Sequence, residues 1–88
     1  MPTTSRVVIY TTAFCGYCDR ARRLLRERDI PFDDIDVTSD PDTRQRIIDE
    51  TGHPTVPVIL IDGALVGGSD DLAALDRAGG LDALAARV

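Results

Sequence analysis

The chain has 88 residues, enough for one domain (residues 1–88) with one hydrophobic core but not for two. Its apolar fraction of 43% and charged fraction of 28% are ordinary for a globular protein and exclude a disordered chain or a membrane-embedded one. Fifteen acidic residues against ten arginines and no lysine give a net charge of −5, which argues against nucleic-acid binding. Because no apolar segment reaches the length of a signal peptide or a membrane span, we expect a cytoplasmic protein.

The first half of the chain predicts two strands joined through a helix. Residues 6–11 are apolar and β-branched, which favours a strand buried on both faces. The charged run 19–28 predicts a helix with its arginines in solvent, and residues 32–37 predict a second strand, parallel to the first. The helix face expected to point inward carries Cys18, Ala21, Leu24 and Leu25.

The second half predicts a helix, a hairpin and two further helices. Asp40 and the proline after it are typical of a helix start, and we expect that helix to end near Gly52. Two apolar runs, 58–61 and 64–66, are separated by an Asp-Gly pair that suits a tight antiparallel hairpin. Ser69 is expected to cap the next helix, and residues 81–87 to form a short terminal helix.

Cys15 and Cys18, the only cysteines of the chain, stand where the first strand gives way to the first helix. Two sulfurs three residues apart can close a disulfide within one helical turn, which is typical of a redox pair. Cys15 falls at or just before the first helical residue, where unpaired N–H groups and the helix dipole favour an anion. Because the thiolate is the nucleophile, we expect Cys15 to attack and the buried Cys18 to resolve.

Two other interpretations of the cysteine pair stay open. Both residues could be small buried side chains without chemistry, or they could be half of a zinc site. Only His53 could readily join them as a ligand, whereas a closed zinc site needs four. We otherwise expect His53 to be a loop residue and Tyr10 to belong to the core.

Three motifs in order resemble the glutaredoxins: Val7–Thr11 leading to Cys15-Gly16-Tyr17-Cys18, then Thr55-Val56-Pro57, then Gly67-Gly68-Ser69-Asp70-Asp71. The likeness covers nearly the whole chain and is greatest to the bacterial dithiol branch. It implies an α/β, thioredoxin-like fold: a small four-stranded mixed sheet flanked by helices in the order β-α-β-α-β-β-α, plus a short C-terminal helix.

The resemblance also implies a glutathione site. In the family a cis peptide bond precedes the equivalent of Pro57 and turns the backbone of Val56 towards the attacking sulfur. A short extended peptide would pair with that backbone as an added strand does. The glutathione-binding residues implied by the resemblance are Thr12, Tyr17, Thr55, Val56, Pro57, Gly68, Ser69 and Asp70.

Gly68, Ser69 and Asp70 would hold the glutamyl end of glutathione. Its carboxylate would meet the N–H groups at the helix start, and its amine would meet the Asp70 carboxylate. Helix capping alone would also explain Ser69 and the aspartates, and the start of a strand would explain Pro57. These alternatives need no ligand.

Two departures from the family pattern lie near the attacking cysteine. Many relatives carry a lysine at the position of Thr12 and a basic residue at the position of Asp19. Both changes remove positive charge, which favours the thiolate and attracts anionic glutathione. We therefore expect Cys15 to ionise more readily than an ordinary thiol but less readily than in lysine-bearing relatives.

Gly16 stands where dithiol relatives usually have proline. The resemblance therefore implies two functions. The first is a glutathione-dependent thiol–disulfide oxidoreductase, a monomer that reduces protein disulfides and glutathione mixed disulfides through Cys15 and Cys18. The alternative is a [2Fe–2S] cluster carrier or sensor, a dimer that holds the cluster with Cys15 of each subunit and two glutathiones. Mycothiol-linked relatives share the Cys-Gly-Tyr-Cys motif, but the Gly-Gly-Ser-Asp-Asp segment favours glutathione.

Overall fold

The computed structural model describes residues 6–84, which form a four-stranded mixed sheet with strand order β2-β1-β3-β4. The predicted order of elements is confirmed up to the end of the third helix. The predicted terminal helix is a single 3-10 turn, and its residues 85–87 lie outside the described residues. The elements are β1 (Val7–Thr11), α1 (Gly16–Glu27), β2 (Phe32–Asp36), α2 (Pro41–Thr51), β3 (Val58–Ile61), β4 (Ala64–Gly67), α3 (Ser69–Arg77) and η1 (Asp82–Leu84).

Strand β1 lies in the middle of the sheet. Ile9 pairs with Asp34 of β2 in a parallel ladder and with Ile59 of β3 in an antiparallel one. The parallel pair joined through α1 confirms the predicted crossover. Because β1 is central, its residues alternate between buried and half-buried, and its carboxyl end brings the following loop and Cys15 to the edge of the sheet.

The hairpin between β3 and β4 turns at Asp62 and Gly63. Both residues have left-handed backbone, with φ of 52° and 82°. A two-residue turn of this kind matches the twist of the strands it joins, and the predicted antiparallel pairing is confirmed. The Asp62 carboxylate also accepts hydrogen bonds of 2.9 and 2.7 Å from the Arg6 guanidinium, which ties the turn to the start of β1.

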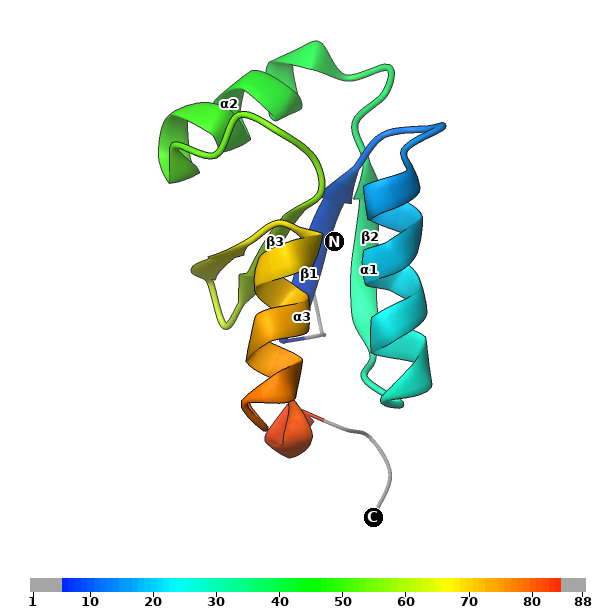
Figure 1. Ribbon diagram of the computed structural model, residues 1–88. Coiled ribbons are helices and arrows are strands. Elements are labelled where there is room, and N and C mark those ends of the chain that lie inside the picture. The colour runs from blue at the N-terminus through cyan, green and yellow to red at the C-terminus, as the bar shows by residue number, and fades with distance from the viewer. Residues whose placement is uncertain (1–5, 85–88) are drawn as a thin grey trace.

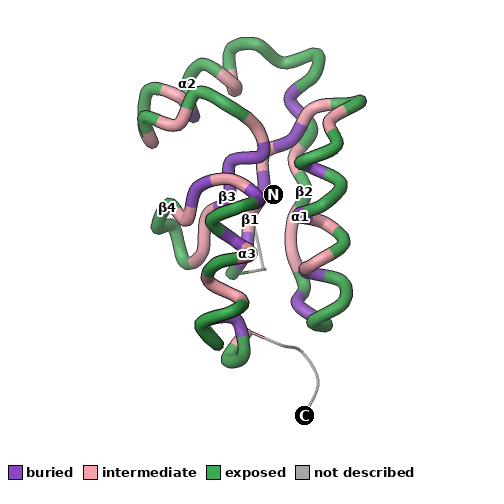
Figure 2. Tube along the Cα trace, viewed as in Figure 1, coloured by how far each residue is buried: buried purple, intermediate pink, exposed green. Residues whose placement is uncertain are grey.

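Helices α1 and α3 lie side by side on one face of the sheet, and α2 lies nearer the end at which β1 stops (Figure 1). The buried stretches of the chain run through β1, β3 and the inner sides of α1 and α3 (Figure 2). No helix within the described part of the chain is long and apolar enough to span a membrane.

Burying an apolar side chain contributes about 1.5–3 kcal/mol, so the core cluster holds α1 in place. It consists of Val7, Ile9, Ala21, Leu25, Ile30, Ile59, Leu72 and Leu81.

Helix α2 begins and ends as predicted. Asp40 accepts hydrogen bonds from the backbone N–H of Thr43 at 3.1 Å and from its hydroxyl at 2.6 Å. Gly52 ends the helix in the left-handed region, with φ of 72°, and its N–H donates to the carbonyl of Ile48. Ile47 is buried and Ile48 half-buried, so the inward face of the helix is also the predicted one.

The start of α3 differs from the prediction. Ser69 does not cap the helix; it is the first helical residue, and Gly68 occupies the N-cap position. The carboxylate of Asp71 reaches back one turn and accepts the Gly68 N–H at 2.9 Å. A Cβ at Gly67, where φ is 124°, would overlap that carboxylate, so the glycine pair leaves room for the reversed cap.

One arginine of α1 is not on the solvated face predicted for it. The side chain of Arg22 is only 18% exposed and forms ion pairs with Asp34 on β2 and Asp19 on its own helix. The other oxygen of Asp34 accepts a 2.7 Å hydrogen bond from the fully buried Thr11 hydroxyl on β1. The partner of Arg22 therefore comes from a neighbouring strand, which helical periodicity cannot reveal.

A second ion pair gives a prediction for stability against pH. Arg28, just after α1, donates hydrogen bonds of 2.8 and 2.9 Å to Asp76 on α3, which lower the pKa of Asp76. A carboxyl whose folded pKa is lowered stabilises the fold above its unfolded pKa of about 4, and this contribution is lost as pH falls through the folded value. We therefore expect Arg28→Gln to lose less stability than the wild type on going from about pH 7 to about pH 3.

Urea unfolding of both proteins at the two pH values measures this difference. Arg23→Gln is the matched control, because Arg23 is exposed on α1, and it should follow the wild type. Equal pH dependence in the wild type and in Arg28→Gln would show that the Arg28–Asp76 pair contributes nothing to folding.

Candidate active site

The sulfur of Cys15 occupies the N-cap of α1. Cys15 has extended backbone, with φ of −113° and ψ of 109°, and its Sγ accepts the backbone N–H of Cys18 at 3.3 Å. The sulfur thus takes the position that a serine or aspartate oxygen takes in other helices, next to the positive end of the helix dipole. The predicted place of Cys15 at the helix start is confirmed, and the residue is half-exposed.

The second sulfur, that of Cys18, lies one turn further along the helix and has 0% exposure. Burial and, after it, the hydrogen bond with Cys15 raise the pKa of the Cys18 thiol to about 11. A backbone hydrogen bond from Thr12 and the positive charge of Arg22 act in the opposite direction but are smaller. The two sulfurs therefore differ in exposure, as their positions in the sequence predict, and burial favours the protonated form of Cys18.

The loop before β3 brings the backbone of Val56 to the reactive sulfur. The Val56–Pro57 peptide bond is cis, as the resemblance implies, and the carbonyl oxygen of Val56 lies 4.0 Å from Cys15 Sγ. Pro57 itself is buried, while Val56 is half-buried. The backbone of Val56 therefore lies beside the thiol.

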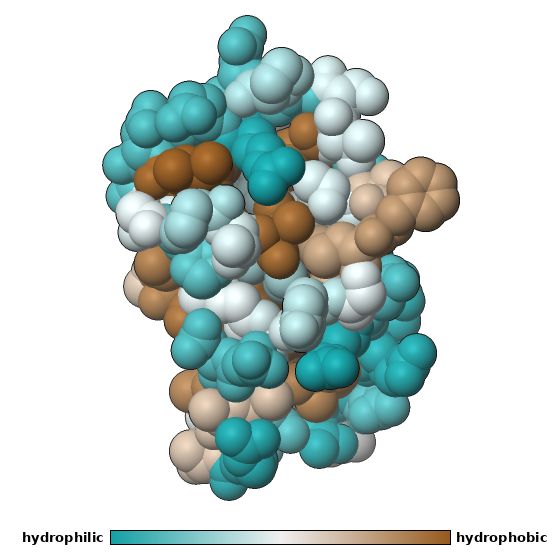
Figure 3. Space-filling view, turned by 45° about the horizontal axis from the view of Figure 1, so that its top comes forward, coloured by the Kyte–Doolittle hydropathy of each residue, from teal (hydrophilic) through white to brown (hydrophobic). Residues whose placement is uncertain are grey.

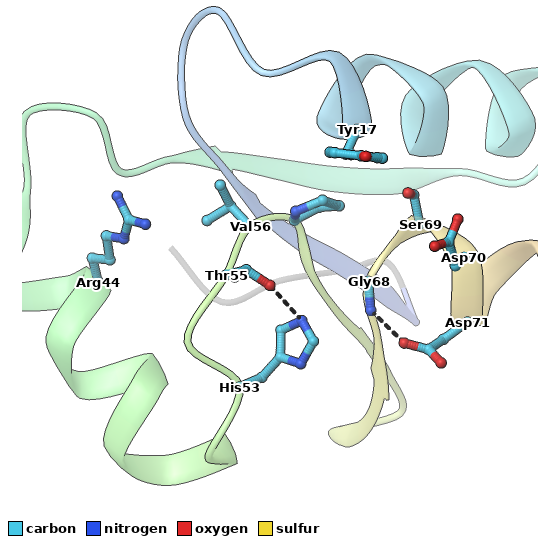
Figure 4. Close-up of a pocket in the computed structure, with 10 residues that line it drawn as sticks. Tyr17, Arg44, His53, Thr55, Val56, Gly68, Ser69, Asp70 and Asp71 are labelled. Atoms are coloured by element: carbon cyan, nitrogen blue, oxygen red, sulfur yellow. Dashed lines mark hydrogen bonds between the residues drawn. The ribbon is translucent and has the colours of Figure 1, made fainter.

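A groove with a volume of about 530 Å³ opens next to this loop (Figure 4). Its size lies within the range of about 300–1,000 Å³ usual for small-molecule sites. The space-filling view shows apolar side chains reaching the surface in the middle of this end of the molecule, with hydrophilic ones around them (Figure 3). The residues that line the groove come from α1, α2, the loop before β3 and the start of α3: Tyr17, Arg44, His53, Thr55, Val56, Pro57, Gly68, Ser69, Asp70 and Asp71.

Seven of the eight residues expected to bind glutathione line this groove, although three separate parts of the chain supply them. Thr12 is the exception. Its side chain is not part of the lining, and its backbone contacts Cys18 instead. The arrangement brings the three motifs of the sequence together around one cavity, while their role in binding stays a prediction.

Three further residues line the groove without having been predicted: Arg44, His53 and Asp71. His53 Nε2 lies 3.4 Å from the Thr55 hydroxyl, within the loop before β3. Within residues 6–84 Arg44 makes no ion pair, and it lies on the opposite side of Val56 from Ser69 and Asp70 (Figure 4). The position of α2, and with it Arg44, depends on packing, so no local sequence signal indicates it.

Comparison with known proteins shows the family to which the chain belongs. The family model described as Glutaredoxin matches residues 7–66, which include both cysteines and the cis-proline loop. The chain belongs to the glutaredoxin family. A glutaredoxin of Pseudomonas aeruginosa is 50% identical over 78 residues, which cover 89% of this chain and 93% of the relative.

Two solved structures of the family have the same thioredoxin-like fold. The solution structure of the dithiolic glutaredoxin 2-C-Grx1 of Trypanosoma brucei brucei is 35% identical, covers 96% of each chain and has a TM-score of 0.82. The crystal structure of the buckwheat glutaredoxin–glutathione complex is 26% identical, covers 92% of this chain and 76% of that one, and has a TM-score of 0.84. Membership of this family makes the protein a thiol–disulfide oxidoreductase.

The contrast between the two thiols gives a direct prediction. With a pKa of about 11, Cys18 has only about one thiolate in ten thousand at neutral pH, and it is buried. Brief treatment of the reduced protein with iodoacetamide near neutral pH should therefore modify Cys15 and spare Cys18, as read by peptide mass spectrometry. Urea-unfolded protein is the control and should be modified at both positions. Comparable labelling of Cys18 in the folded protein would contradict its buried, protonated state.

Proposed function

We propose that the protein is a glutathione-dependent oxidoreductase that reduces protein disulfides and glutathione mixed disulfides through Cys15 and Cys18. The observation that carries the proposal is the position of the half-exposed Cys15 sulfur, at a helix N-terminus and 4.0 Å from the Val56 carbonyl at the groove. A thiolate at this position can attack a disulfide whose peptide part lies in the groove.

The charges of the groove suit glutathione, which carries two carboxylates and one amine. Arg44, which makes no ion pair within residues 6–84, is available to one carboxylate on one side of Val56. On the other side, the start of α3 offers backbone N–H groups to the second carboxylate, and the exposed Asp70 suits the amine. The separation of these groups along the groove favours a ligand with charges at both ends.

The middle of such a ligand would lie along Val56. The backbone N–H and C=O of Val56 would pair with the cysteinyl residue of glutathione, as an added strand pairs with a sheet edge. Two side chains that line the groove would contact the ligand from the sides: Tyr17 of α1, which is 58% exposed, and Thr55. This placement directs the glutathione sulfur to Cys15.

The reaction divides into two exchanges. The Cys15 thiolate attacks the glutathione sulfur of a mixed disulfide, forms a Cys15–glutathione disulfide and releases the other thiol, which takes a proton. A second glutathione thiolate then attacks that disulfide, forms glutathione disulfide and returns Cys15 as a thiolate. With a protein disulfide, Cys18 instead attacks the Cys15–protein disulfide and leaves a Cys15–Cys18 disulfide for glutathione to reduce.

The partners follow from this scheme. They are glutathione and proteins that carry an accessible disulfide or a glutathionylated cysteine. A thiol pair that cycles with a small thiol works where that thiol is kept reduced, so we place the protein in the cytoplasm and expect it to act as a monomer.

Single replacements of the two cysteines test the scheme. Cys15→Ser should abolish turnover, because no other exposed thiol is available in the chain. Cys18→Ser should keep activity on a glutathionylated peptide, because only Cys15 is needed there, and should lose activity on an intramolecular protein disulfide. A coupled assay with glutathione reductase measures both activities. Loss of activity on the glutathionylated peptide in Cys18→Ser would contradict the monothiol exchange.

The [2Fe–2S] alternative rests on Gly16, which is exposed and has nothing within 4 Å of the place a Cβ would take. Within residues 6–84 no group of three or more histidine, cysteine or acidic side chains is arranged to hold a metal ion. One chain offers a single half-exposed thiol, so a cluster would need Cys15 of two subunits and two glutathiones. Anaerobic purification with glutathione separates the functions: a coloured dimer with weak turnover favours the cluster, and a colourless active monomer favours the oxidoreductase.

A further inference from the structure

The two sulfurs of an oxidised Cys15–Cys18 pair are not equally open to attack. Cys15 is half-exposed at the groove, whereas Cys18 has 0% exposure. An incoming thiolate therefore reaches only Cys15, and the sulfur that leaves is always that of Cys18. The electron pair of the broken bond, and with it a full negative charge, appears inside the protein.

A buried anion is costly unless hydrogen bonds or a cation accompany it. Burial is the main reason why the Cys18 thiol resists ionisation. Two groups of the protein act against this effect, the Thr12 backbone and the side chain of Arg22. The larger of the two effects comes from the Thr12 backbone, which a side-chain replacement leaves in place, so Arg22 is the group whose contribution a substitution can test.

Arg22 is held in place by groups on three elements. It follows Cys18 by four residues on α1, so the two side chains are neighbours on the helix surface. Its Nε donates to Asp34 of β2, and its Nη1 donates to Asp19 at 2.7 Å. The Thr11 hydroxyl, fully buried on β1, donates to Asp34 from the other side at 2.7 Å.

The exposures of these side chains indicate where the positive charge acts. The Arg22 side chain is 18% exposed, whereas those of Asp34 and Asp19 are 30% and 68% exposed. The guanidinium is therefore more shielded from water than either carboxylate, and water screens its charge less. Its positive charge lies one helical turn from Cys18 and favours the thiolate form of that residue.

We propose that Arg22 is a positioning residue that stabilises the Cys18 sulfur as it leaves the Cys15–Cys18 disulfide, and that Thr11 and Asp34 hold its guanidinium in place. An ion pair with a purely structural role, such as Arg28–Asp76 at the far end of α1, would affect folding but not this step. The inference rests on the dithiol part of the proposed function.

Dithiothreitol tests the step without glutathione. Its thiolate attacks Cys15 Sγ, a mixed disulfide with Cys15 forms, the Cys15–Cys18 bond breaks, and Cys18 leaves as a thiolate that then takes a proton. The second thiol of dithiothreitol then displaces Cys15, so the reagent is oxidised by two electrons and the protein is reduced. The reduction rate of the oxidised protein therefore reports the departure of Cys18 directly.

We expect Arg22→Gln to slow this reduction about tenfold, which corresponds to about 1.4 kcal/mol of lost stabilisation of the leaving sulfur. Arg22→Lys keeps the charge and should restore most of the rate. Arg23→Gln, a neighbouring exposed arginine of α1, is the matched control and should react like the wild type.

A second measurement separates this role from a structural one. In a Cys18→Ser background no buried thiolate leaves, so Arg22→Gln should change turnover of a glutathionylated peptide less than about twofold. The proposal is overturned if dithiothreitol reduces oxidised Arg22→Gln as fast as oxidised Arg23→Gln. It is also overturned if Arg22→Gln lowers turnover in the Cys18→Ser background by the same factor as it lowers the rate of reduction by dithiothreitol. If the protein does not depend on glutathione, the glutathionylated peptide is not turned over at all, whereas the rates of reduction by dithiothreitol are unaffected.

Discussion

The hydrogen bond from the backbone N–H of Cys18 to the sulfur of Cys15 makes the first turn of α1 a binding site for a sulfur anion. It exists because β1, the central strand, ends just before the cysteines, and because the core packs α1 firmly against the sheet. The same turn buries Cys18, so one structural feature makes the two thiols different. The groove beside Val56 gives substrates access to Cys15.

Features set by neighbouring residues were predictable from the sequence. The place of Cys15 at a helix start follows from the change from an apolar run to a charged amphipathic one. The caps of α2 and the turn at Asp62 follow in the same way from the local chemistry of aspartate, proline and glycine. The parallel pair of strands could be predicted because a helix of this length between two strands of one sheet makes a crossover connection.

Features set by long-range packing were not predictable. The start of α3 is a local exception, because Gly68 and Ser69 both suit an N-cap and the Asp71 carboxylate accepts the Gly68 N–H three residues earlier. Arg22 has the helical position of a solvated residue, and only the register of β2 places Asp34 beneath it. Arg44 lines the groove because the loop that follows α2 turns back beside the helix, and the periodicity of α2 does not reveal this packing.

The central claim is that the first turn of α1 makes Cys15 the attacking sulfur. In the Cys18→Ser protein Cys15 is the only thiol in the chain, so the rate at which this protein reacts with a small aromatic disulfide near neutral pH measures its reactivity directly. The account predicts a clearly higher rate for the folded protein than for the same protein unfolded in urea. Equal rates in the two states would contradict it.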